Sequence, residues 1–256
     1  MTSRMINTVF TGTPKNKPPL LIVHGLYGSA RNWGAIARRL SDDRQVINVD
    51  MRNHGESDWF DSHSYPDMAT DLAEVITANG GQADVIGHSM GGKAAMALAL
   101  THPALVRRLL IADIAPVVYD RTQVSYIHAM RGLDLAQVEK RSDADRMLSE
   151  AIPEDGVRAF LLQSLDIKGK RWRLNLDVLE REMPRIMGFP DMKERFDGPT
   201  LFLSGGDSDY VQPEHRSAIK ALFPKARFAR IVGVGHWLHA EKPREFTETA
   251  RAFFNA

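Results

Sequence analysis

Short apolar runs recur along this chain, and each is followed by a glycine or a polar residue. Runs so short and so apolar are typical of strands that are buried on both faces of a parallel sheet. They lie at residues 20–23, 46–49, 85–86, 109–112, 200–203 and 227–232. This pattern constrains the fold more than any other feature, because it requires covering layers on both sides of the strands.

Segments with helical patterns separate most of these runs. They cover residues 33–40, 65–78, 90–100, 213–222 and 241–254. Strands that alternate with helices predict an α/β fold with a doubly wound, mostly parallel sheet. Ligands of such sheets bind beyond the carboxyl ends of the strands. The polar residues that follow the apolar runs are therefore candidates for a functional site.

Residues 117–190 interrupt the alternation and contain no clear strand. Helical patterns cover residues 120–133, 143–151, 156–165 and 176–183. We interpret this stretch as a helical cap inserted into an α/β core that is formed by residues 1–116 and 191–256. Its apolar residues at helical spacing are typical of plain core, but above the edge of the sheet they could also line an acyl pocket.

Composition excludes several classes of function. Lys plus Arg number 33 and Asp plus Glu number 32, so a net charge of +1 favours neither nucleic acid nor an anionic membrane as a partner. The absence of cysteine excludes a thiol nucleophile, disulfides and Cys-ligated metals. No apolar run resembles a signal peptide or reaches the roughly 20 residues that cross a bilayer. We expect a soluble, cytoplasmic protein of 256 residues with one main core.

The strongest chemical motif is Gly87-His-Ser-Met-Gly91, which matches the Gly-x-Ser-x-Gly nucleophile elbow. It follows an apolar run and precedes a segment rich in alanine and leucine, so it lies between a strand and a helix as the elbow requires. The glycines let neighbouring backbone pass close to the turn. We therefore predict Ser89 as a nucleophile. A purely structural glycine-rich turn is the weaker interpretation.

Two further loops complete the candidate site. His24-Gly-Leu-Tyr-Gly28 follows the first run, where a loop can donate a backbone N–H to an oxyanion hole. The predicted donors are the N–H groups of Leu26 and Met90. His236 lies in the loop before the last helix and is the predicted general base, since a serine needs a base within hydrogen-bond reach. The competing His239 is assigned to packing or to the rim of the site.

The acid of the site has three candidates. Asp113 ends the run at residues 109–112, so its side chain should emerge at the edge of the sheet where the elbow lies. Asp207 and Asp209 lie in the loop after the next run. In many hydrolases the acid stands three residues before a valine in that loop, and here Ser208 holds that position. A carboxylate at a buried strand end needs a partner, which His236 would provide to Asp113.

Together these motifs resemble the α/β-hydrolase family, whose triad residues follow one another in the order serine, acid, histidine. Within it the chain is similar to the YbfF-like bacterial esterases. The matching motifs are His24-Gly-Leu, Val49-Asp-Met-Arg-Asn-His-Gly-Glu-Ser57, Gly87-His-Ser-Met-Gly-Gly-Lys93, Asp113-Ile-Ala-Pro116, Trp172-Arg-x-Asn175 and Gly235-His-Trp-x-His-Ala-Glu-Lys-Pro243. The resemblance implies a carboxylesterase or thioesterase that acts on short acyl esters and acyl-CoA thioesters. It favours Asp113 as the acid and implies no metal or organic cofactor.

Our prediction is a serine hydrolase with Ser89, Asp113 and His236, whose partner is a small-molecule ester or thioester with a small to medium acyl group. The same triad also supports carbon–carbon bond hydrolysis or a lyase reaction, which is the alternative. A non-catalytic binding protein is a weaker one, because both Ser89 and His236 are intact. Dehalogenases and epoxide hydrolases would need an aspartate at position 89. The sequence assigns no oligomeric state.

Overall fold

A seven-stranded sheet forms the centre of the computed structural model, which describes residues 5–256. The strand order is β1-β3-β2-β4-β5-β8-β9, and only β1 runs antiparallel to its neighbour. The doubly wound, mostly parallel sheet predicted from the sequence is therefore confirmed. The strands are β1 (Thr8–Thr11), β2 (Leu20–Val23), β3 (Val46–Val49), β4 (Ala83–His88), β5 (Val106–Ala112), β8 (Thr200–Gly205) and β9 (Ala226–Ile231).

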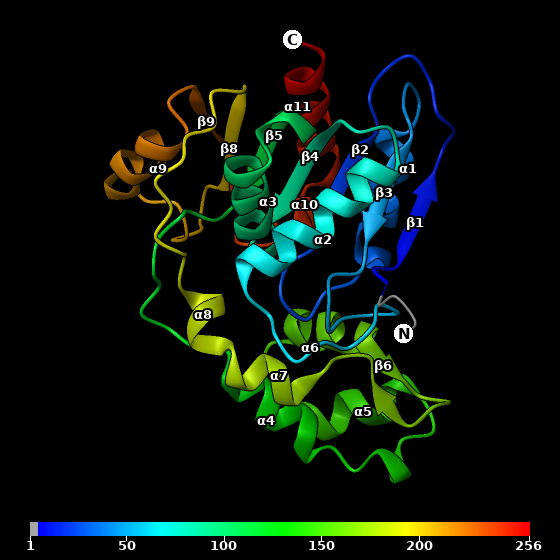
Figure 1. Cartoon of the computed structure of the whole chain (residues 1–256). Coiled ribbons are helices and arrows are strands. Elements are labelled where there is room, and N and C mark those ends of the chain that lie inside the picture. The colour runs from blue at the N-terminus through cyan, green and yellow to red at the C-terminus, as the bar shows by residue number, and fades with distance from the viewer. Residues whose placement is uncertain (1–4) are drawn as a thin grey trace.

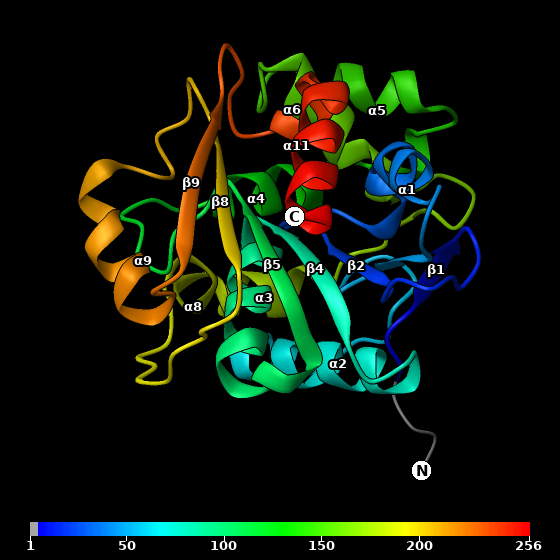
Figure 2. The same ribbon diagram turned by 90° about the horizontal axis from the view of Figure 1, so that it is seen from above.

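The strands of the sheet alternate their side chains between two apolar clusters. Within β2, Leu21 and Val23 belong to one cluster and Leu20 and Ile22 to the other, because successive side chains of a strand point to opposite faces. Helices α2 (Tyr65–Ala78), α3 (Met90–Thr101) and α9 (Arg216–Leu222) cover the first face, and α1 (Gly34–Leu40) and α11 (Pro243–Asn255) cover the second (Figure 2).

The edge strand β1 has no counterpart among the predicted strands. Its four residues are half-buried or exposed, so it lacks the continuous apolar run that marks the central strands. Proline explains a second difference, within the predicted helix 241–254. Because Pro243 fixes its own φ and begins a new helix, the chain forms α10 (Leu238–Glu241) and then α11.

Residues 117–190, here called the inserted segment, lie between β5 and β8 in the sequence. Their helices are α4 (Val124–Gly132), α5 (Arg141–Leu148), α6 (Asp155–Leu161), α7 (Leu176–Arg181) and α8 (Met183–Met187). The expectation of no strand was wrong at one place, where β6 (Leu165–Asp166) and β7 (Arg171–Trp172) pair. Two-residue strands are too short to show a periodicity. Their turn is stabilised by the Gly169 N–H, which donates to the Asp166 carboxylate over 3.0 Å.

Most of the inserted segment lies beyond the end of the sheet at which the parallel strands finish (Figure 1). It contacts the loops that follow β2 and β3. The Ser164 hydroxyl donates to the Tyr27 carbonyl over 2.9 Å, and Asn175 donates to the Asn53 side chain over 3.0 Å. A single β-bridge joins His54 to Leu174. These contacts place the segment directly over the loops that carry the predicted site.

None of the helices in the described part of the chain combines the length and the apolar character that crossing a membrane requires.

Candidate active site

Ser89 occupies a sharp turn between β4 and α3. Its backbone has φ 53° and ψ −124°, a strained conformation for a residue with a side chain. The flanking glycines are required sterically. A Cβ on Gly87 would lie 2.4 Å from the carbonyl oxygen of Gly91, and a Cβ on Gly91 would lie 2.3 Å from that of His24. The turn therefore has the conformation and the close packing of a nucleophile elbow.

Asp113 follows the last residue of β5 and is completely buried. Its carboxylate accepts three hydrogen bonds, from the Gly205 N–H at 3.0 Å, from the Ser208 hydroxyl at 2.5 Å and from Nδ1 of His236 at 2.7 Å. A carboxylate withdrawn from water needs such partners. The structure therefore brings Asp113 and His236 together, as expected for an acid that orients a histidine.

The ring of His236 is held on both sides. It stacks on the ring of Tyr210 with centroids 4.0 Å apart, and the ring of His88 lies 4.7 Å away. Nε2 of His88 also donates to the backbone carbonyl of His236 over 2.9 Å. Because Nδ1 donates to Asp113, the neutral ring keeps Nε2 free to accept a proton.

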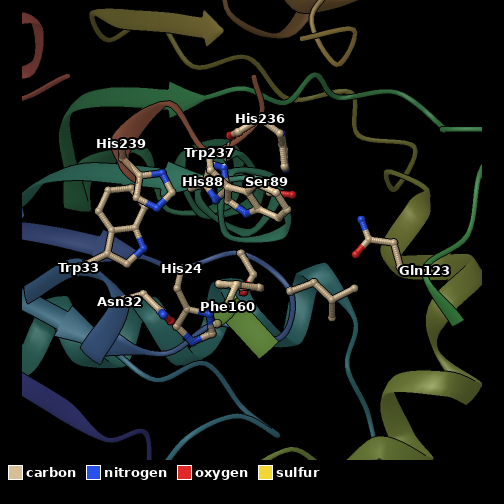
Figure 3. Close-up of a pocket in the computed structure, with 13 residues that line it drawn as sticks. His24, Asn32, Trp33, His88, Ser89, Gln123, Phe160, His236, Trp237 and His239 are labelled. Atoms are coloured by element: carbon tan, nitrogen blue, oxygen red, sulfur yellow. Dashed lines mark hydrogen bonds between the residues drawn. The ribbon is translucent and has the colours of Figure 1, made fainter. Parts of the chain in front are cut away.

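Ser89 and His236 line one pocket, which we call the His236 pocket (Figure 3). Its other lining residues come from the segment between β2 and α1, from the end of β4, from the start of α4, from α6 and from α10 with the turn before it. They include His24, Gly25, Leu26, Gly28, Asn32, Trp33, His88, Gln123, Phe160, Trp237 and His239. Within residues 5–256 no hydrogen bond joins the Ser89 hydroxyl to the His236 ring. Such bonds are often long before substrate binds.

The two rival carboxylates point elsewhere. Asp209 is 68% exposed and forms an ion pair with Arg121 over 3.0 Å, and Asp207 is exposed. Between them, Ser208 stands at the position where many hydrolases have their acid, and its hydroxyl donates to Asp113. The sequence had identified the unusual residue at 208 but assigned it no role. Nothing in the sequence indicated the stacking of Tyr210 on His236.

His239 is buried and stacks on Trp33 with centroids 4.0 Å apart and rings 8° from parallel. Burial, together with repulsion from His236, lowers the pKa of His239 to about 3. A ring that stays neutral and has an aromatic partner on its face is suited to packing. Packing and the rim of the site are the two roles that the sequence assigns to it, and His239 also lines the pocket that contains Ser89.

Two buried histidines shape the loop that carries Leu26. His24 donates from Nδ1 to the Gly25 carbonyl and accepts the Met51 N–H at Nε2. Burial lowers its pKa below the usual value. His54 accepts the Tyr27 N–H over 3.1 Å, and burial lowers its pKa to about 3. Both rings therefore act here as neutral hydrogen-bonding groups that fix the backbone.

The predicted oxyanion donors, the N–H groups of Leu26 and Met90, are given no acceptor by the hydrogen bonds of the described residues. Met90 is the first residue of α3, where N–H groups have no partner within the helix and attract negative charge. Both residues line the space next to Ser89. No group of three or more His, Asp or Glu side chains within residues 5–256 is arranged to hold a metal ion.

A parallel sheet, a serine at a strained strand-to-helix turn and a histidine bound to a buried aspartate define an α/β hydrolase. The profile of the alpha/beta hydrolase family matches residues 20–249, and the chain belongs to this family.

Known relatives agree with that assignment. The chain is 41% identical to the sn-1-specific diacylglycerol lipase ABHD11 of Mus musculus over 249 residues, which cover 92% of this chain and 80% of that protein. It is 40% identical to the esterase YbfF of Escherichia coli K12, and the match covers 94% of both chains. A solved marine microorganism esterase superposes with a TM-score of 0.92 at 38% identity, covering 98% of this chain and 100% of the other. The resemblance to YbfF-like esterases is confirmed.

Proposed function

We propose that this protein is a serine hydrolase that cleaves carboxylic esters, and acyl thioesters, through an acyl-enzyme on Ser89. The observation that carries the proposal is the 2.7 Å bond from His236 Nδ1 to the buried Asp113, with Ser89 in the same pocket. The relatives named above, which are esterases and a diacylglycerol lipase, support ester hydrolysis by a hydrolase of this family.

In the first step, Nε2 of His236 takes the hydroxyl proton as the Ser89 oxygen attacks the acyl carbon. Asp113 keeps the ring in the reactive tautomer and stabilises the imidazolium. The carbonyl oxygen becomes an oxyanion, which accepts hydrogen bonds from the N–H groups of Leu26 and Met90. The intermediate then collapses, and His236 gives its proton to the departing alcohol or thiol.

In the second step, water attacks the acyl-Ser89 ester. His236 accepts a proton from this water, and the same oxyanion donors stabilise the second intermediate. Collapse releases a carboxylic acid and returns the proton to the Ser89 oxygen. Every proton is therefore moved by one imidazole, and the cycle uses no group beyond this chain, the substrate and water.

Two pockets meet at Ser89, and their residues suggest which half of the substrate each one takes. The His236 pocket is the one that takes the leaving group, because His236 must reach the departing oxygen or sulfur. The second pocket, here the acyl pocket, contains apolar Ile114, Ile186 and Met187. Its other lining residues are Leu26, Tyr65, Ser89, Met90, Lys93, Tyr119, Gln123 and Tyr210.

The inserted segment supplies residues to both pockets, among them Phe160 and Ile186. We therefore infer that residues 117–190 act as a cap over a core of residues 1–116 and 191–256. In this arrangement an acyl group of small to medium length is enclosed between the segment and α3. The cap then selects the acyl chain while the sheet carries the chemistry.

The test compares the wild type with Ser89→Ala on p-nitrophenyl butyrate, on acyl-CoA thioesters and on substrates for carbon–carbon bond hydrolysis. We expect ester and thioester turnover in the wild type and a loss of at least about three orders of magnitude in the variant. A fluorophosphonate probe should modify Ser89, as located by peptide mass spectrometry. Modification of another serine, or turnover of the carbon–carbon substrates alone, would refute the proposal.

A further inference from the structure

Lys93 is a buried cation on α3 that the proposed chemistry does not use. Its side chain is almost completely buried, with 1% of the residue exposed. The ammonium donates to three backbone carbonyls: Val117 at 2.9 Å, Met187 at 2.9 Å and Gly188 at 2.6 Å. An ammonium has three N–H donors, so each one has its own acceptor.

Burying an ammonium costs free energy unless its hydrogen bonds compensate for the lost hydration. Lys93 has no carboxylate partner among the described residues, and its nearest ring is that of Tyr119, at 4.7 Å from Nζ. Burial lowers the pKa of Lys93 to about 7. A methionine or leucine could fill the same volume without desolvating a charge. The hydrogen bonds to these three carbonyls therefore account for a lysine at this position.

The three carbonyls belong to the two ends of the inserted segment. Val117 is its first residue, and Met187 and Gly188 lie close to its last. One ammonium thus ties the chain where it leaves the sheet to the chain where it returns. A neighbouring bond holds the same end, because the Tyr65 hydroxyl donates to the Ile186 carbonyl over 2.6 Å.

The tied residues also form the wall of the acyl pocket. Ile186 and Met187 line that pocket together with Ser89 and Lys93 itself. Lys93 stands one helical turn after Ser89, and its N–H donates to the Ser89 carbonyl over 3.1 Å. The nucleophile and the far wall of the pocket are therefore connected through one turn of α3 and one side chain.

We propose that Lys93 is a positioning residue that sets the depth of the acyl pocket by binding both ends of the inserted segment to the nucleophile helix. The proposal rests on the proposed ester hydrolysis and concerns the acyl chain that this reaction accepts. With Lys93 in place, Met187 and Ile186 stay at a fixed distance from Ser89. Without it, the carbonyls of Val117 and Gly188 lose their donor and turn toward water, while the Met187 carbonyl keeps only the Tyr119 N–H at 3.0 Å. This wall of the pocket is then free to withdraw.

The experiment measures kcat and KM on p-nitrophenyl acetate and p-nitrophenyl octanoate for the wild type and for Lys93→Met. We expect the octanoate-to-acetate ratio of kcat/KM to rise by about tenfold, an effect of the size that changes in an apolar pocket produce. The acetate rate should change much less. Lys220→Met is the matched control, because Lys220 also donates to two backbone carbonyls, those of Pro224 and Ala226, but lies outside the acyl pocket.

An equal loss on both esters, or an unchanged ratio in a folded Lys93→Met protein, would overturn the proposal. If that variant does not fold, Tyr65→Phe provides the test, since it removes one bond to Ile186 from the same junction. The octanoate-to-acetate ratio of kcat/KM should then also rise, by a smaller factor than in Lys93→Met. An unchanged ratio would contradict the proposal. Ser89→Ala separates the two proposals, because esterase activity that survives in it refutes the hydrolase mechanism whatever Lys93 does.

Discussion

The sheet and the inserted segment position their functional residues in different ways. At the sheet, Ser89 and Asp113 directly follow paired strands whose side chains fill two apolar clusters. The inserted segment shares the first of these clusters, through residues such as Ile186 and Met187, and adds polar contacts to the sheet side, such as those of Lys93 with Val117 and of Ser164 with Tyr27. The positions of the catalytic residues therefore depend on strand pairing, whereas the shape of the pocket depends on apolar packing and also on a few hydrogen bonds that single substitutions can remove.

The largest expected effect tests the sheet side. Asp113→Asn removes the charge that orients His236 and should lower kcat by up to about four orders of magnitude, as in other triads. Asp209→Asn, which only breaks the exposed pair with Arg121, should leave kcat nearly unchanged. Steady-state hydrolysis of p-nitrophenyl butyrate measures both, with circular dichroism to show that each variant is folded. The opposite order would move the acid to the loop after β8.

Acid should destabilise the folded chain through buried histidines of the sheet side. His54 and His239 each have a pKa lowered to about 3 by burial, whereas an unfolded histidine titrates near about 6.5. Between these values the unfolded chain binds protons that the folded chain does not, so stability falls as the pH drops from about 6.5 toward 3. Each ring should contribute a few kcal/mol to this loss.

The check is urea unfolding at neutral pH and at pH about 4. His239→Phe, which keeps an aromatic ring against Trp33, should lose less stability on acidification than the wild type does. His128→Gln is the matched control, because His128 is the histidine of the inserted segment and its side chain is 63% exposed. Equal pH dependence in all three proteins would show that the buried rings are not responsible.

Ser208→Ala should have an intermediate effect on catalysis. It removes one of the three donors to Asp113 while Gly205 and His236 keep theirs. A single hydrogen bond to a charged group contributes about 1.5–3 kcal/mol, so we expect kcat to fall by roughly tenfold or somewhat more, with little change in KM. Ser217→Ala on the exposed surface of α9 serves as the control. A kcat equal to that of the wild type would show that the hydroxyl does not support the acid.

The smallest effect should come from one contact between the two regions. Ser164→Ala removes the hydrogen bond to the Tyr27 carbonyl and should cost about 1 kcal/mol in the free energy of unfolding. Tyr27 directly follows Leu26, a predicted oxyanion donor, so kcat on the acetate ester should also fall, by no more than about threefold. Urea unfolding and acetate hydrolysis measure the two quantities. A loss as large as that of Asp113→Asn would mean that the segment takes part in the chemistry.

The sequence was most informative for residues that come directly after a predicted strand. The elbow could be inferred because apolar runs place polar residues at one edge of a sheet. The same reasoning left Asp113, Asp207 and Asp209 as candidate partners of His236, and the family resemblance favoured Asp113. The structure now brings Asp113 and His236 within 2.7 Å. The function of Ser208 could not be inferred, since its partner is distant in the sequence and serine forms many kinds of hydrogen bond.

The inserted segment was harder to predict for a related reason. The strands β6 and β7 have two residues each, and no periodic pattern can extend over so short a distance. Lys93 ends one of the motifs that match the YbfF-like esterases, but its acceptors are backbone carbonyls of Val117, Met187 and Gly188. Every residue has a backbone carbonyl, so the sequence cannot indicate which carbonyls a side chain binds. Only the folded chain shows these contacts.

The pairing of β4 with β5 determines where residues can be inserted or deleted without separating the nucleophile from the acid. His88 stands opposite Ala112, so Ser89 and Asp113 each take the next place after the last paired residue of adjacent strands. Their separation in space is set by strand register and does not depend on how many residues connect them. Extra residues between Thr101 and Val106 would leave the nucleophile and the acid aligned. A single deletion within β5 would instead turn the carboxylate to the opposite face of the sheet, since a one-residue shift reverses every side chain.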